Sequence, residues 1–155
     1  MQRIPSFQID HTRLKRGVYV SRVDDVGGNA VTTYDIRVVR PCWDLAMDGA
    51  AVHTIEHLAA TILRNGPMAD RVIYFGPMGC LTGFYLILAG EPNVQVVSEI
   101  VHSVFVQIRE WPIEDGIPGT KIGECGNPWY HNLEQAKQIA SAFLLTKWEN
   151  EYPKK

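Results

Sequence analysis

The sequence has few cysteines and no long apolar segment, and both absences limit the kind of protein it can be. Its 155 residues include three cysteines, an odd number that cannot all pair within the chain. Residues 1–10 contain no apolar stretch suited to a secretion signal, and no apolar run reaches the roughly 18 residues of a membrane span. We therefore expect free thiols, a reducing cytoplasmic setting and no membrane association.

An excess of one charge is also lacking. The chain has 15 basic and 17 acidic residues, a net charge of -2, and no run of Lys or Arg. This balance does not favour nucleic acid or an anionic membrane surface as a partner. There is no internal repeat, low-complexity tract or linker, and apolar residues make up 46% of the chain. We expect a single domain over residues 1–155, large enough to bury its own core.

Periodicity predicts an α+β domain. Strands are expected at residues 18–23, 31–39, 71–75 and 81–89, and helices at 48–65, from 94 to about 108, and from 132 onward, where Asn132 and Gln135 predict a capping box. A turn at 24–29 joins the first two strands into a hairpin whose apolar face alone is covered, with Asp35 and Arg37 on the other face. We expect a mainly antiparallel sheet of about four strands packed against about four helices.

The stretch from His53 to His57 is the most informative part of the chain. Residues four apart on a helix lie on the same face, so both imidazoles can reach one metal ion, with Glu56 beside them. A catalytic site needs a third protein ligand and an open position. The alternative is a solvated polar face, which is less favoured because these three residues interrupt an otherwise apolar helix.

The same spacing, His-x-x-Glu-His, matches the inverted zinc-peptidase motif, in which the glutamate is the general base. Such peptidases have larger domains and complete the site with a downstream glutamate. Glu124 could fill that role, but Cys125 stands beside it, and a thiolate is the stronger ligand for Zn or Fe(II). A metallopeptidase is therefore the second hypothesis.

The three cysteines differ in their surroundings. Cys80 follows a turn with Gly76 and Gly79, which suits either an accessible, reactive thiol or a small buried side chain entering a strand. Cys125 lies in a loop containing Gly126 and Pro128, a composition suited to placing a ligand. Cys42 carries no functional signal, and we expect it to have a packing role.

Five separate motifs form one pattern along the chain. They are Ser6-Phe7 with Asp10-His11-Thr12, Tyr34–Arg37, His53–Leu58, Pro77–Tyr85, and Glu124–Asn127 followed by His131-Asn132-Leu133 and Ala136. In this order they resemble the S-ribosylhomocysteine lyase (LuxS) family over nearly the whole chain. Two positions depart from the family pattern: Gly76 stands where the family usually has serine, and an aspartate usual near Tyr74 is missing.

The resemblance implies a carbon–sulfur lyase that binds one Fe(II) per subunit, which Zn or Co can replace. The metal ligands would be His53, His57 and Cys125. Cys80 and Glu56 would carry protons, and Arg37 would favour the thiolate of Cys80. By the same resemblance, Ser6, His11 and Arg37 would meet the substrate, with Ser6 and His11 holding ribose hydroxyls.

The family's products imply a role in the methyl cycle and in quorum sensing. Cleavage of S-ribosylhomocysteine would give homocysteine and 4,5-dihydroxy-2,3-pentanedione, the precursor of autoinducer-2. The resemblance further implies a homodimer with active sites at the interface, which would explain how Ser6, His11 and Arg37 reach the metal helix. A third hypothesis is a metal-binding signalling protein that has lost turnover.

Overall fold

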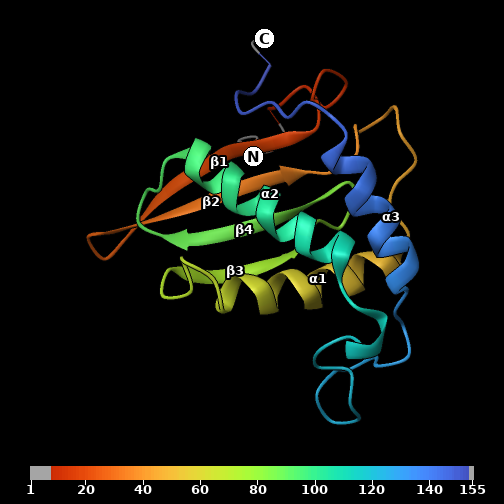
Figure 1. Cartoon of the computed structure of the whole chain (residues 1–155). Coiled ribbons are helices and arrows are strands. Elements are labelled where there is room, and N and C mark those ends of the chain that lie inside the picture. Colours follow the sequence, from red (N-terminus) through yellow and green to blue (C-terminus); the bar gives the residue numbers. More distant parts are fainter. Residues whose placement is uncertain (1–7, 154–155) are drawn as a thin grey trace.

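A four-stranded antiparallel sheet forms one layer of the molecule, with strand order β1-β2-β4-β3 (Figure 1). The computed structural model describes residues 8–153. The strands are β1 (Gly17–Val26), β2 (Asn29–Arg37), β3 (Val72–Pro77) and β4 (Gly83–Ala89). All four lie where periodicity predicts a strand, which confirms the antiparallel sheet.

The helices lie together on one face of this sheet (Figure 1). They are α1 (Gly49–Arg64), α2 (Val94–Glu110) and α3 (Leu133–Leu144). Residues 8–153 thus hold three α-helices rather than about four, and the remaining helical segment is one 3-10 turn, Ile113–Asp115. Pro112 precedes this turn and Gly116, with φ of 65°, ends it. Within the same residues, no helix is both long and apolar enough to cross a membrane.

Local sequence signals account for the ends of the helices. Asp48 accepts hydrogen bonds from the amides of Ala50 and Ala51 and so caps α1, and Asn93 caps α2 in the same way through Gln95. The β1–β2 turn is shorter than expected, because Gly27 and Gly28 both adopt positive φ (62° and 84°) and close it in two residues.

The core lies between the sheet and the helices. Tyr34, Ile36, Phe84 and Leu86 point from alternate positions of β2 and β4 toward the helices and are almost fully buried. They meet a stripe on the helices made up of Ala51, Ile55, Leu58, Val101, Phe105 and Phe143. This packing fixes α1, and with it the face that carries His53 and His57.

The opposite face of β2 is also buried, and the expectation of a single covered face was wrong. Asp35 and Arg37 are each only 2% exposed. They form an ion pair with each other, with 2.6 Å between Nη2 and Oδ2, so neither charge is buried alone. The chain beyond α3 returns over this face, where the Tyr152 ring stacks on Tyr19. Alternation along one strand cannot reveal cover supplied by the distant end of the chain.

Candidate active site

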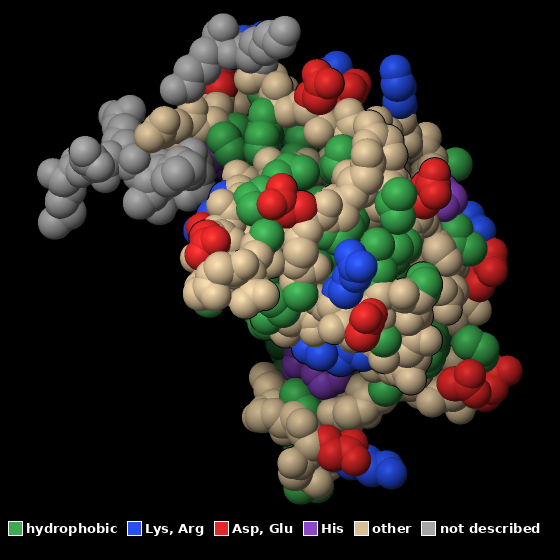
Figure 2. All heavy atoms as spheres, turned by 90° about the vertical axis from the view of Figure 1, so that its left-hand side faces the viewer, with side chains coloured by type: hydrophobic (Ala, Val, Ile, Leu, Met, Phe, Trp, Pro, Cys, Tyr) green, Lys and Arg blue, Asp and Glu red, His purple; other side chains and the backbone are tan. Residues whose placement is uncertain are grey.

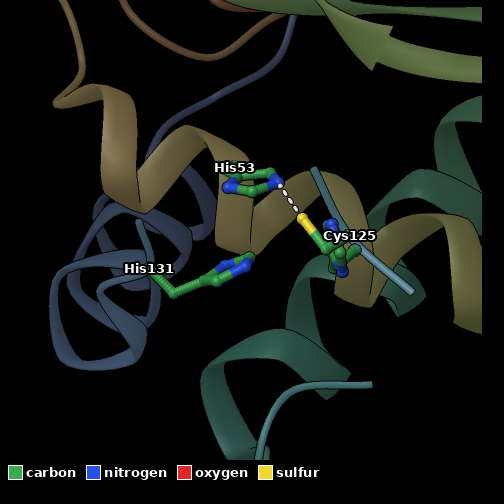
Figure 3. Close-up of side chains that lie close together, drawn as sticks. His53, Cys125 and His131 are labelled. Carbon is green, nitrogen blue, oxygen red and sulfur yellow. Dashed lines mark hydrogen bonds between the residues drawn. The ribbon is translucent and has the colours of Figure 1, made fainter. Parts of the chain in front are cut away.

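Four potential metal ligands converge on one point. His53 and His57 come from α1, and Cys125 and His131 come from the loop that joins α2 to α3 and protrudes at the bottom of Figure 1. One ligand atom from each lies within 4.8 Å of the other three. Figure 3 shows His53 and His131 directed toward the sulfur of Cys125, and Figure 2 shows histidines (purple) in the recess between the protruding loop and the body.

Backbone carbonyls of the loop fix the tautomers of the two helix histidines. His53 Nδ1 donates to the carbonyl oxygen of Tyr130, and His57 Nδ1 donates to that of Pro118, each at 2.8 Å. In a neutral ring held this way, Nε2 carries the lone pair, and Nε2 of His53 lies 3.4 Å from the Cys125 sulfur. Metal-bound histidines typically have this arrangement, in which the second nitrogen is held by a hydrogen-bond acceptor.

His131 is oriented in the same way by Thr54. The Thr54 hydroxyl donates its hydrogen to the Ala50 carbonyl oxygen at 2.9 Å, so toward His131 it can only accept. His131 Nδ1 therefore donates to Thr54 Oγ1 at 3.2 Å, and Nε2 is left buried with no hydrogen-bond partner among the described residues. Burial, together with His53 and His57, lowers the pKa of His131 to about 4, so the ring stays neutral at neutral pH.

Sequence reasoning gave His131 no role at the metal, because its place depends on how α3 docks on α1. The backbone N–H of Asn132 donates to Thr54 Oγ1 at 2.9 Å. The predicted capping box is therefore only half correct: Asn132 Oδ1 caps the Gln135 amide at 3.0 Å, but the Gln135 side chain does not take the Asn132 backbone N–H. The sequence signal that could have drawn attention to His131 was its place directly before the predicted helix cap, Asn132.

The orientation of the imidazole rings distinguishes His131 from His53 and His57. The His53 and His57 rings are nearly perpendicular, at 85°, so their in-plane lone pairs can converge on one ion. His131 stacks on His53, with 4.0 Å between ring centroids and 20° between planes. An ion at a bond length of about 2.0 Å cannot lie in both of these planes. Ring orientation therefore favours His53, His57 and Cys125 over His131 as ligands of one ion, and we call these three residues the convergent set. Their imidazole and thiolate donors suit Zn or Fe(II).

The two glutamates considered from sequence lie outside this set. Glu56 is partly buried and has no hydrogen bond or ion pair within the described part of the chain. Glu124 bonds through a side-chain oxygen to the Lys121 amide at 3.3 Å and is absent from the four-residue cluster. The third ligand that an inverted zinc peptidase requires is therefore not in place.

A second group surrounds Cys80, in the turn between β3 and β4. Arg37 Nη1 donates to Thr82 Oγ1 at 2.6 Å and lies 3.9 Å from the Cys80 sulfur. The Thr82 oxygen, 3.1 Å from that sulfur, has its hydrogen free to donate to it. Partial burial would raise the pKa of Cys80, but the bonds from Thr82 and the charge of Arg37 outweigh it and lower the pKa. Arg37 thus lies beside the Cys80 thiol.

The remaining expectations have mixed outcomes. His11 is partly buried, and its Nδ1 lies 3.0 Å from the Ile9 carbonyl oxygen. Ser6 lies outside the described residues. Cys42 is exposed and has φ of 67°, so the packing role expected for it was wrong. All three cysteines are free thiols.

Comparison with known proteins finds similarity over nearly the whole chain. The family model for S-Ribosylhomocysteinase (LuxS) matches residues 4–153. A Desulfotalea psychrophila protein is 50% identical over 151 residues, covering 97% of this chain and 94% of its own. A Porphyromonas gingivalis protein is 48% identical over 93% of this chain and 90% of its own. A Phocaeicola vulgatus protein is 45% identical over 100% of this chain and 99% of its own. Each of the three is named S-ribosylhomocysteine lyase. The chain belongs to the S-ribosylhomocysteinase (LuxS) family.

Proposed function

We propose that the protein is an S-ribosylhomocysteine lyase, which releases homocysteine and 4,5-dihydroxy-2,3-pentanedione. The observation that carries this proposal is that one chain holds both a cluster of three histidines and one cysteine that could bind a metal ion and a thiol with a lowered pKa. The name shared by relatives 45–50% identical to this chain supports the same substrate. The pentanedione, as the precursor of autoinducer-2, connects the reaction to both quorum sensing and the methyl cycle.

The reaction explains why a proton carrier is needed. A thioether resists direct hydrolysis, but the homocysteine thiol can leave C5 of the sugar once a carbonyl stands at C3. The carbonyl must therefore move from C1 to C2 and then to C3. Each move takes a proton from one carbon and returns it to the neighbouring one, which is general acid–base catalysis.

Two side chains are suited to carry these protons. Cys80 is exposed and has a lowered pKa, which favours the thiolate form that can take and return a proton. We assign the second role to Glu56, whose carboxylate is partly buried one helical position from His57. Arg37 keeps its charge because it is paired with Asp35, and it stabilises the Cys80 thiolate.

The donor set suits a divalent ion, and we infer one Fe(II) per subunit, replaceable by Zn or Co, held by His53, His57 and Cys125. When bound, the ion supplies a Lewis acid for the sugar oxygens. The chain itself fixes the donors through the carbonyls of Tyr130 and Pro118. His131 keeps a buried Nε2 lone pair beside this set, with no hydrogen-bond partner among the described residues.

We further propose a cytoplasmic homodimer with its active sites at the interface, where Ser6, His11 and Arg37 meet the substrate. Free cysteines support the reducing compartment. Large exposed apolar side chains, Trp43 at 69% and Leu45 at 92%, support burial against a second copy. Mixing a His11→Ala variant with a Cys125→Ala variant, each inactive alone, should restore part of the activity. No recovery from mixed dimers would contradict a shared site.

The experiment that tests the lyase is release of a thiol. Protein loaded anaerobically with Fe(II) should release homocysteine catalytically from S-ribosylhomocysteine, and Cys80→Ala should abolish release while metal content stays intact. Cys42→Ser is the matched control, because Cys42 is also an exposed thiol. Absence of release from the folded, metal-loaded protein would overturn the proposal and favour a metal-binding protein without turnover. Release by Cys80→Ala would remove this residue from the mechanism.

A further inference from the structure

The chain beyond α3 returns to the sheet and is held there by backbone contacts. The Glu149 amide donates to the Arg16 carbonyl oxygen, and the Val18 amide donates to the Glu149 carbonyl oxygen, each at 3.0 Å. A Cβ at Gly17 would collide with that same Glu149 oxygen, so the close approach requires glycine. This attachment places Tyr152 over the buried face of β2.

Tyr152 contacts both Tyr19 and Asp35 there. Its ring stacks on Tyr19, with 4.8 Å between centroids and 11° between planes. Its hydroxyl donates to Asp35 Oδ2 at 3.2 Å. Burial, followed by the charge of Asp35, raises the pKa of Tyr152, so the hydroxyl stays protonated and remains a donor.

Asp35 in turn forms hydrogen bonds with Arg37. The carboxylate accepts two bonds from the guanidinium, Nη2 to Oδ2 at 2.6 Å and Nε to Oδ1 at 3.1 Å. Because the guanidinium is planar, fixing these two nitrogens also fixes Nη1, which points at Thr82 and Cys80. Tyr152, Asp35 and Arg37 thus form a chain of hydrogen bonds that leads from the end of the protein to Thr82 and the Cys80 thiol.

We propose that Tyr152 is a positioning residue for the Cys80 thiol, which acts by holding the Asp35 carboxylate in the orientation that aims Arg37 at the sulfur. Without the tyrosine hydroxyl, Oδ2 of a carboxylate only 2% exposed loses one of its two donors, and the carboxylate can rotate away from its bidentate pairing. This inference rests on the proposed role of Cys80, but its main test does not require turnover.

The test compares Tyr152→Phe with Tyr19→Phe in the full-length, metal-loaded protein. Both variants remove one buried hydroxyl from the same ring stack, but Tyr19 donates its hydroxyl to the Lys15 carbonyl oxygen at 2.9 Å and not to Asp35. The pH dependence of iodoacetamide alkylation is followed at the Cys80 peptide by mass spectrometry, so Cys42 and Cys125 do not contribute. Thermal melts confirm that both variants are folded at the assay temperature.

Tyr152→Phe should raise the alkylation midpoint by about half a pH unit, which lowers the thiolate fraction about threefold at a pH well below the midpoint. Tyr19→Phe should leave the midpoint in place. An unchanged midpoint in Tyr152→Phe, or an equal shift in both variants, would overturn the inference. As a second measurement, kcat for homocysteine release should fall about threefold in Tyr152→Phe with little change in KM. If the protein is not a lyase, only this second measurement is lost, and the alkylation result still decides the role of Tyr152.

Discussion

The phenolic ring of Tyr74 covers the α-carbon of Gly76, so that a Cβ at Gly76 would collide with the tyrosine hydroxyl. The two residues stand two positions apart on β3 and therefore on the same face of the strand. The two positions are thus coupled: with the tyrosine ring in this orientation, a side chain at residue 76 has no room unless the ring moves.

A double-mutant cycle tests this coupling. Gly76→Ser alone should lower the free energy of unfolding by about 1 kcal/mol, a modest cost because Tyr74 is 46% exposed and its hydroxyl end can swing outward. With Tyr74→Ala in place, the same serine should cost little, which gives a coupling energy of roughly 0.5–1 kcal/mol in urea melts. Strictly additive effects would show that the two positions are independent.

Local features of the structure were predictable from sequence because their causes are local. The i, i+4 spacing of His53 and His57, the Asp48 cap and the strand periods all act within a few residues. Burial of the Asp35–Arg37 pair was not predictable in this way, because Tyr152, at the far end of the chain, contacts Asp35 and the neighbouring Tyr19. The place of His131, in the loop before α3, likewise depends on Thr54, which lies on α1.

Ligand substitutions should separate the convergent set from His131. Cys125→Ala removes the soft donor and should lower metal affinity by more than about 100-fold, whereas His131→Gln should lower it by less than about tenfold. The reason is ring orientation: His131 stacks on His53 and cannot share its ion without turning. Metal competition with a chromophoric chelator measures both values, and far-ultraviolet circular dichroism checks the fold. Equal losses would mean that His131 is itself a ligand.

The acidity of Cys80 should depend on the Thr82 hydroxyl. Hydrogen bonds to the sulfur favour the thiolate, so the pKa of Cys80 is lowered and alkylation stays fast until the pH falls below this lowered midpoint. Thr82→Val removes the donor, so the midpoint should rise and alkylation at neutral pH should slow. Thr146→Val is the control, because that hydroxyl bonds only to the Phe143 carbonyl oxygen at 2.8 Å, among residues 8–153. A midpoint that does not move in Thr82→Val would assign the acidity to Arg37 alone.

Removal of the metal should loosen the loop that supplies Cys125 and His131. The carbonyl oxygens of Pro118 and Tyr130 accept hydrogen bonds from the Nδ1 groups of the α1 histidines, which attaches the loop to the helix at two points. A bound ion would add Cys125 as a third attachment. Lys121 is exposed and lies between two of these attachments, Pro118 and Cys125. Trypsin needs an unfolded segment around the bond that it cuts, so the cleavage rate at this lysine reports how often the loop detaches.

We therefore expect a chelator to increase cleavage after Lys121 severalfold, and Zn or Fe(II) to restore protection when added back. Cleavage after Lys147, an exposed lysine beyond α3, should change little, because that residue has no attachment to the cluster. Cys125→Ala should behave like the chelated protein at every metal concentration, since its loop has lost the third attachment. If cleavage after Lys121 is the same with and without metal, the carbonyl bonds alone hold the loop, and the ion has no part in its order.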